Sequence, residues 1–230
     1  MNRRPLSDAF GMAQRTMKDN GSTVLKMGAI FAAMNFIMFL PALMMDVTGI
    51  FDDMFQGDIP MGLQGMSSEQ QAATLLQTGL FVVTSFVNAI LWMGGLQLGL
   101  AMVDGKTADL WDAVLDVDLV PIAVLIAFVD MLILPAWMCC LFPGLVISAC
   151  VFHWPTAVVD KPGDAMGAFS QSVDFIRNDF IGHTAMVAVL TFALMLGSLF
   201  YYIPAVLIFP FAVLTTAHMY RLRVPRLAEE

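Results

Sequence analysis

Long apolar stretches alternate with short polar segments along the whole 230-residue chain. A helix of about 20 apolar residues is long enough to cross the ~30 Å hydrocarbon core of a bilayer. Six stretches approach this length, and no Gly-rich, Pro-rich or Ser-rich linker divides them. We therefore predict an all-α polytopic membrane helical bundle that forms a single membrane domain over residues 1–230. The six predicted transmembrane spans are 23–45, 73–103, 118–140, 143–160, 181–200 and 203–221.

Shorter amphipathic segments precede several of the apolar stretches. In the last of these segments, Met166, Phe169, Val173 and Ile176 recur at helical spacing with polar residues between them. A helix of this kind lies in the headgroup plane and turns its apolar face toward the lipid. The predicted cytoplasmic interfacial helices are 5–20, 106–117 and 163–178.

The charged residues are divided between the two sides of this layout. All 11 lysines and arginines fall on one side, whereas the outer loop 46–72 carries acidic residues and no base. Basic residues are retained on the cytoplasmic side of a membrane, so both termini are predicted to be cytoplasmic. Charged residues make up only 13% of the chain, against about a quarter in soluble domains. We expect the bacterial inner (cytoplasmic) membrane as the location.

A carboxylate is predicted near the middle of the bilayer. Asp130 lies in the central part of the third predicted span. An ionised carboxylate at that depth costs several kcal/mol unless it is paired or protonated. The other polar residues near this depth are Asn35, Asn88 and Thr191, with His153 somewhat nearer the cytoplasm. Either these polar groups hold the bundle together by hydrogen bonds, or they form a site for a proton, a cation or a lipid headgroup.

The second predicted span carries small and polar residues on one face. Ser85, Asn88, Trp92, Gly95 and Gly99 follow one another at steps of three and four residues. Glycines on a membrane helix permit close approach of another backbone, and an asparagine can bond across helices. This face is therefore predicted to pack centrally in the bundle or against another copy.

The outer loop combines carboxylates, methionines and aromatic side chains. Thioethers suit Cu(I) and carboxylates suit hard cations, but regular spacing and histidines are missing, so no metal is predicted. A loop this apolar is instead expected to form a surface for a partner protein or a cap at the interface. The residues of this predicted outer-loop surface are Phe51, Asp52, Asp53, Met54, Phe55, Asp58 and Met61.

Catalytic signatures do not emerge from the sequence. It contains no HExxH pattern, no GxSxG elbow and no phosphate-binding loop. We therefore predict no catalytic residues, no cofactor and no enzyme activity. His183 and His218 are expected to be satisfied histidines near cytoplasmic helix ends. The cysteines lie in apolar stretches, where small buried hydrophobic residues are the favoured interpretation and a redox-active adjacent pair is the alternative; they are Cys139, Cys140 and Cys150.

One segment of about forty residues has a more distinctive order of features. A Pro-Gly begins a membrane helix that ends in Val-Asp, and an interfacial helix follows with an alanine, a serine, a basic residue and an aromatic residue. These positions are Pro143, Gly144, Asp160, Ala168, Ser172, Arg177 and Phe180. The segment resembles the YciC-like uncharacterised bacterial integral membrane proteins. They are related to the membrane domain found beside some glycerophosphodiester phosphodiesterases. The resemblance implies an order of membrane helices and almost nothing about chemistry.

These patterns favour a non-enzymatic integral membrane protein. It would act as an accessory or assembly subunit, or as a modulator of membrane properties. The alternative is a small transporter or lipid-handling protein that uses the polar site around Asp130. The expected partners are membrane lipids and either a membrane protein complex or further copies of the chain, and no nucleic acid.

Overall fold

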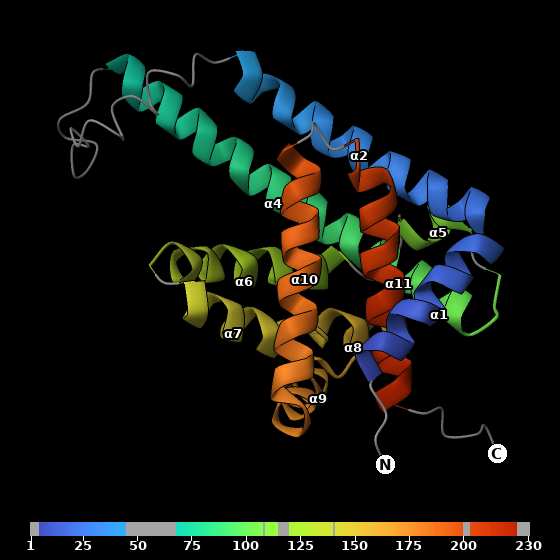
Figure 1. The fold of residues 1–230 in the computed structure, drawn as a ribbon. Coiled ribbons are helices and arrows are strands. Elements are labelled where there is room, and N and C mark those ends of the chain that lie inside the picture. The colour runs from blue at the N-terminus through green and yellow to red at the C-terminus, as the bar shows by residue number, and fades with distance from the viewer. Residues whose placement is uncertain are drawn as a thin grey trace.

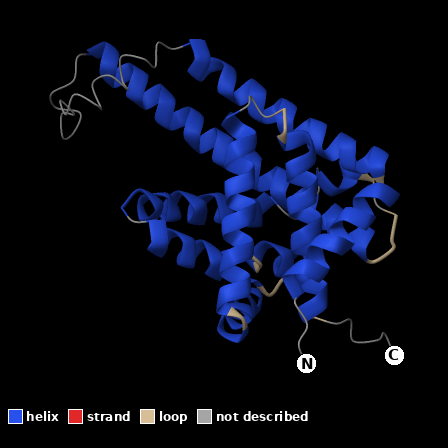
Figure 2. Ribbon diagram, viewed as in Figure 1, coloured by secondary structure: helices blue, strands red, loops and turns tan. Residues whose placement is uncertain are grey.

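A computed structural model describes residues 5–44, 68–107, 109–114, 120–139, 141–199 and 203–224. All regular secondary structure in these ranges is helical, which confirms the predicted all-α class (Figure 2). The helices are α1 (Pro5–Asp19), α2 (Gly21–Met44), α4 (Ser68–Val103), α5 (Leu110–Val114), α6 (Val120–Cys139), α7 (Leu141–Val151), α8 (Trp154–Asp160), α9 (Ala165–Asn178), α10 (Phe180–Leu199) and α11 (Ala205–Arg223).

Three of the helices are long and apolar enough to cross a membrane. They are α2, α4 and α11, over Gly21–Met38, Thr78–Val103 and Ala205–Arg223. Among the described residues, α6 and α10 contain shorter apolar stretches, Val120–Val129 and Phe180–Leu194. In Figure 1, α6 and α7 run across the direction of α10 and α11. The helices thus agree with a membrane protein, while the count of six spans remains a prediction.

The predicted span 143–160 is divided into α7 and α8. The chain turns at Phe152 and His153, and Pro155 stands in the first turn of α8. Proline has no backbone N–H and is tolerated in a first turn, where that donor would be unpaired in any case. The bend expected at Pro155 is therefore a complete interruption of the helix. Neither α7 nor α8 alone has the length that a bilayer crossing requires.

The last helix, α11, lies at the centre of the fold. It contacts α1, α2, α4, α8 and α10. Of its apolar stretch 67% is buried inside the protein, against 22% of the apolar stretch of α2. Gly28 of α2 lies directly on the α11 backbone, because a Cβ added there would overlap the carbonyl of Val206. The Phe31 ring stacks on Phe209 nearby, with centroids 3.9 Å apart. Close backbone approach through a small residue is the usual way in which membrane helices pack.

The predicted packing face of α4 also lies against α11. A Cβ added at Gly95 would come within 3.2 Å of the Phe209 ring, and one at Gly99 within 2.8 Å of the Val213 side chain. The Trp92 ring meets Phe209 edge-on at 5.8 Å, and Ser85 and Asn88 on the same helix are half-buried. The helix that approaches these two glycines belongs to the same chain.

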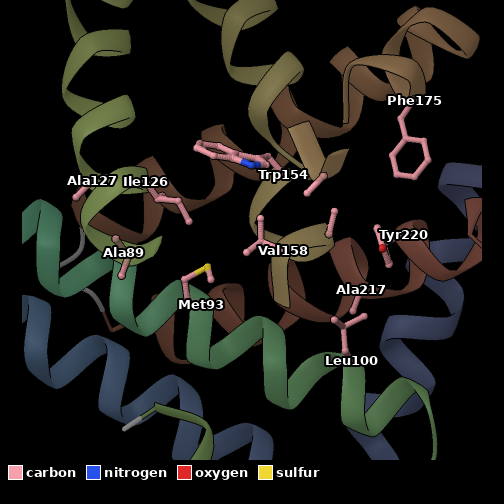
Figure 3. Packing of buried hydrophobic residues seen from close by; sticks show 13 residues of the cluster. Ala89, Met93, Leu100, Ile126, Ala127, Trp154, Val158, Phe175, Ala217 and Tyr220 are labelled. Carbon is pink, nitrogen blue, oxygen red and sulfur yellow. The ribbon is translucent and has the colours of Figure 1, made fainter. Parts of the chain in front are cut away.

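The largest buried cluster joins α4, α6, α8, α9 and α11 (Figure 3). Met93 and Leu100 of α4 face Val158 of α8, while Ile126 comes from α6 and Tyr220 from α11. Burial of a large apolar side chain stabilises a fold by roughly 1.5–3 kcal/mol relative to exposure in water. This cluster connects the break between α7 and α8 to the carboxyl ends of α4 and α11.

In α9, the stripe that packs against the protein differs from the predicted apolar face. The buried side chains are Ala168, Ser172, Phe175 and Ile176. Of the predicted apolar face, Ile176 is buried and Val173 is half-buried, whereas Met166 is 79% exposed and Phe169 is also exposed. The helix presents two apolar stripes, and the one rich in small residues fits against α7, α8 and α10. The other stripe is exposed in this structure.

Candidate functional site

The carboxyl ends of α4, α8 and α11 meet in an ion-pair network. Arg221 donates from Nε to Oδ1 of Asp104 at 3.0 Å and from Nη2 to Oδ2 at 2.9 Å. The same Nη2 donates to Oδ1 of Asp160 at 2.6 Å, and the Tyr220 hydroxyl donates to Oδ2 of Asp160 at 3.0 Å. Two-point contact between a guanidinium and a carboxylate is strong and directional. One arginine therefore fixes three helix ends relative to one another.

A second arginine fixes the joint between α9 and α10. Arg223 donates from Nη2 to Oδ2 of Asp179 and from Nη1 to the Phe175 carbonyl, both at 2.7 Å. Asp179 also accepts from the Gly182 backbone N–H at 3.0 Å and so satisfies a donor in the first turn of α10. The end of α11 is thereby tied to the turn between α9 and α10.

Two histidines are in contact just inside these ion pairs. His153 lies in the turn between α7 and α8, and His183 lies in the first turn of α10. Their ring centroids are 4.7 Å apart, and both side chains are completely buried. The rings of Phe152 and Phe175 each meet His153 edge-on at 5.5 Å. All four ring nitrogens lack a hydrogen-bond partner among the residues that the structure describes.

This arrangement corrects the expectation for His183 and agrees with the one for His218. His183 is near a helix end as expected, but it is buried against His153 and its ring is unsatisfied within the described ranges. His218 is also buried, and its Nε2 lies 2.9 Å from the Thr16 hydroxyl of α1. Sequence reasoning did not connect His153 with His183, because nothing local to either residue indicates their contact.

Four of the predicted midplane residues have described side chains, and these side chains do not bond to one another. Asn35 is buried on α2 and donates to the Phe31 carbonyl of its own helix at 3.0 Å. Asn88 and Thr191 are half-buried on α4 and α10, and His153 contacts His183 instead. No hydrogen bond joins these four residues to one another in the described part of the chain. Asp130 belongs to α6, but its side chain lies outside the described residues.

The distinctive forty-residue segment supplies contacts within the protein. Asp160 belongs to the Arg221 network, and Ser172 is fully buried and donates to the Cys150 carbonyl at 2.7 Å, which joins α9 to α7. Trp154 donates from Nε1 to the Ala165 carbonyl at 2.9 Å. Gly144 and Ala168 are buried, whereas Pro143, Arg177 and Phe180 are exposed. Within the described ranges, these residues therefore act mainly through packing and hydrogen bonding.

Several predicted features cannot be placed. The outer-loop surface, Phe51 to Met61, lies outside the described residues, as does Cys140 and the side chain of Cys139. Cys150 is half-buried and carries a free thiol. Across the described residues, no group of three or more His, Cys, Asp or Glu side chains is arranged to hold a metal ion.

Comparisons with known proteins identify no relative of this chain. No protein-family model matches the sequence, and neither a curated protein nor a solved structure matches it. The resemblance to the YciC-like membrane proteins therefore stays a prediction from the segment that carries it.

Proposed function

We propose that the chain is a non-enzymatic integral membrane protein that acts as an accessory or assembly subunit of a membrane protein complex. The observation that carries this proposal is an uncovered apolar arm, formed by the amino-terminal half of α4 beside α2. The arm projects from the rest of the molecule (Figure 1). Its exposed large side chains on α4 are Leu75, Leu76, Phe81, Val82 and Val83.

The geometry of α4 supports a role for this arm in assembly. The helix has 36 residues, which corresponds to about 54 Å at 1.5 Å per residue, whereas ~30 Å is enough to cross the hydrocarbon core. The exposed residues of the arm surround the helix axis rather than lying on one stripe. Large apolar side chains that are exposed on several sides of a helix require apolar surroundings. Lipid and the membrane-embedded helices of a partner subunit both provide them.

The charged side chains support the same proposal. Arg221, Arg223, Asp104, Asp160 and Asp179 hold helix ends together. Because these charged groups bind one another within the protein, we expect the apolar surfaces to make the contacts with other molecules. The transport or lipid-handling alternative rests on Asp130 and stays a prediction, because that side chain lies outside the described residues.

Site-specific photocrosslinking tests the arm. A photoreactive amino acid at Val82, which is 44% exposed, is expected to yield one discrete product with a second membrane protein. The same probe at the exposed Ile203, outside the arm, should yield no such product. Purification in mild detergent should recover this protein with the wild-type chain and lose it with the double variant Leu75→Ala, Phe81→Ala. A strictly monomeric particle without a partner, obtained under the same conditions, would contradict the proposal.

We also propose that both termini face the cytoplasm. Support comes from the ion-pair network, because it joins the ends of α4, α8 and α11, which the charge pattern assigns to the cytoplasmic side. A fluorescent protein fused after residue 230 should then fluoresce, and alkaline phosphatase at the same position should be inactive. Active phosphatase with a dark fluorescent fusion would reverse the orientation.

A further inference from the structure

The His153–His183 contact has a feature that simple packing does not explain. A neutral imidazole has one N–H donor and one acceptor nitrogen. A buried polar group without a partner costs about 1–3 kcal/mol, and the two adjacent rings contain four such nitrogens within the described structure. Two apolar side chains would fill the same space without this cost. A ligand that pairs with these nitrogens would remove this cost, and it must be small enough to fit between two fully buried rings.

We propose that His153 and His183 together form a binding site for a single proton. The proton adds to an unprotonated ring nitrogen of one imidazole, and the resulting N–H donates to the lone pair of the other ring. Ring centroids 4.7 Å apart allow two ring nitrogens to reach hydrogen-bond distance, roughly 2.7–3.2 Å, by small rotations of the side chains. A proton requires no cavity, and a metal ion would require further ligands that the described residues do not provide.

The side chains around the pair can accommodate one positive charge. The rings of Phe152 and Phe175 lie 5.5 Å from His153, and the Tyr220 ring lies at 6.4 Å. Each of the two T-shaped contacts with phenylalanine sets the edge of one ring against the face of the other. An imidazolium edge against a phenylalanine face would be attracted to it, and this attraction would offset part of the loss of water around the charge.

Some charged groups near the pair oppose its protonation and others favour it. Arg223 repels a proton on either ring, and Asp179, held 2.7 Å from Arg223, attracts one to His183. From the side of α11, the Tyr220 hydroxyl is directed to Asp160, which shares Arg221 with Asp104. That second group contains two carboxylates and one guanidinium. Repulsion from Arg223 limits occupancy to one proton, because a second imidazolium would face both the first and the guanidinium.

Asp179 is the partly exposed charged group next to the pair. Its side chain is 32% exposed, and its carbonyl accepts from the His183 backbone N–H at 3.1 Å. Asp179 is therefore a partly exposed carboxylate one helical turn before His183, on the side from which solvent is nearest in sequence to that ring. Loading of the pair would place a positive charge beside Arg223 and alter the joint between α9, α10 and α11.

Histidine NMR in lipid nanodiscs tests this site directly. Protein labelled with ¹⁵N in its histidine rings is titrated from about pH 8 to about pH 4.5, a range that brackets ordinary imidazole titration. His153 and His183 are expected to respond together, with one midpoint and one proton bound by the two rings. In His183→Phe, proton binding at His153 should weaken by about tenfold, a shift of about one pH unit. The His153→Phe variant should have the reciprocal effect on His183.

The third histidine provides a matched control. His218 bonds to Thr16, on the side of α11 that packs against α1, so His218→Phe should leave the shared titration unchanged. Independent titration of the two rings with separate midpoints would overturn the proposal, as would the absence of any response before the protein unfolds. The wild-type titration decides between these outcomes by itself if neither phenylalanine variant folds.

Discussion

Replacement of Arg221 with methionine is expected to reduce the free energy of unfolding by about 3 kcal/mol or more. The change removes the only cation that pairs with both Asp104 and Asp160 within the described structure, and it leaves two carboxylates facing each other in a mostly buried site. A buried carboxylate that loses its counter-ion is costly, because hydrogen bonds to neutral groups do not replace the lost attraction of the guanidinium. Thermal unfolding of the purified protein in detergent should show the loss as a marked decrease in Tm.

A surface arginine provides the control for this experiment. Arg177 is 77% exposed and lies 3.7 Å from Asp174 on the same helix, so Arg177→Met should change stability by less than about 1 kcal/mol. Adding Asp104→Asn and Asp160→Asn to the Arg221 variant should restore part of the loss, since the repelling charges are then removed. Equal effects of the Arg221 and Arg177 substitutions would contradict the assignment of Arg221 as the residue that joins the three helix ends.

Valine at position 28 is expected to separate α2 from α11. Its Cβ would overlap the Val206 carbonyl, and a backbone oxygen inside a packed helix cannot move aside without displacing the helix. Overpacking of a tight contact costs typically 1–3 kcal/mol and sometimes more, and we expect Gly28→Val to lie at or above the upper end. A cysteine pair introduced across the interface, crosslinked in membranes, would report the separation together with the loss of stability.

The same substitution at position 79 is the matched control. Gly79 lies in α4, and a Cβ added there meets no atom within 4 Å. Valine has a somewhat better helix propensity than glycine, so Gly79→Val should be neutral or slightly stabilising. A Gly28→Val protein that is as stable and as readily crosslinked as wild type would show that α2 does not approach α11 this closely.

Features that depend on neighbouring residues were the ones that the sequence predicted well. Apolar runs gave the positions of the long helices to within a few residues, including α2 and α11. The spacing of Trp92, Gly95 and Gly99 indicated a packing face, since residues three and four apart lie on the same side of a helix. The interruption before Pro155 was anticipated only as a bend, because a proline indicates where a helix is weak but not how far the chain turns.

Contacts between distant segments were beyond this reasoning. Arg221 lies 117 residues from Asp104 and 61 from Asp160, and no local periodicity specifies such pairs. One signal was present in the sequence: each of the three residues follows or ends an apolar stretch on the side predicted to be cytoplasmic. Opposite charges at the same depth could have suggested pairing, although not which partners meet. The contact between His153 and His183 offered no comparable signal.

The pattern in α9 shows a different ambiguity. Its Met166 stripe and its Ala168 stripe are both apolar enough to be buried, and hydrophobicity alone does not distinguish lipid from protein as the neighbour. The size of the side chains was the more useful guide, because Ala168 and Ser172 permit close approach to neighbouring helices. In membrane proteins small residues mark such contacts more reliably than large apolar ones do.

The central position of α11 has a consequence for biosynthesis. The helix is translated after α1, α2 and α4, yet all three pack on it. These earlier helices therefore lack their native neighbour until residues 205–223 have been synthesised. Premature termination before residue 205 would leave every one of them without its main contact surface, so quality control of this protein is expected to recognise truncated chains as unassembled rather than as shorter versions of the fold.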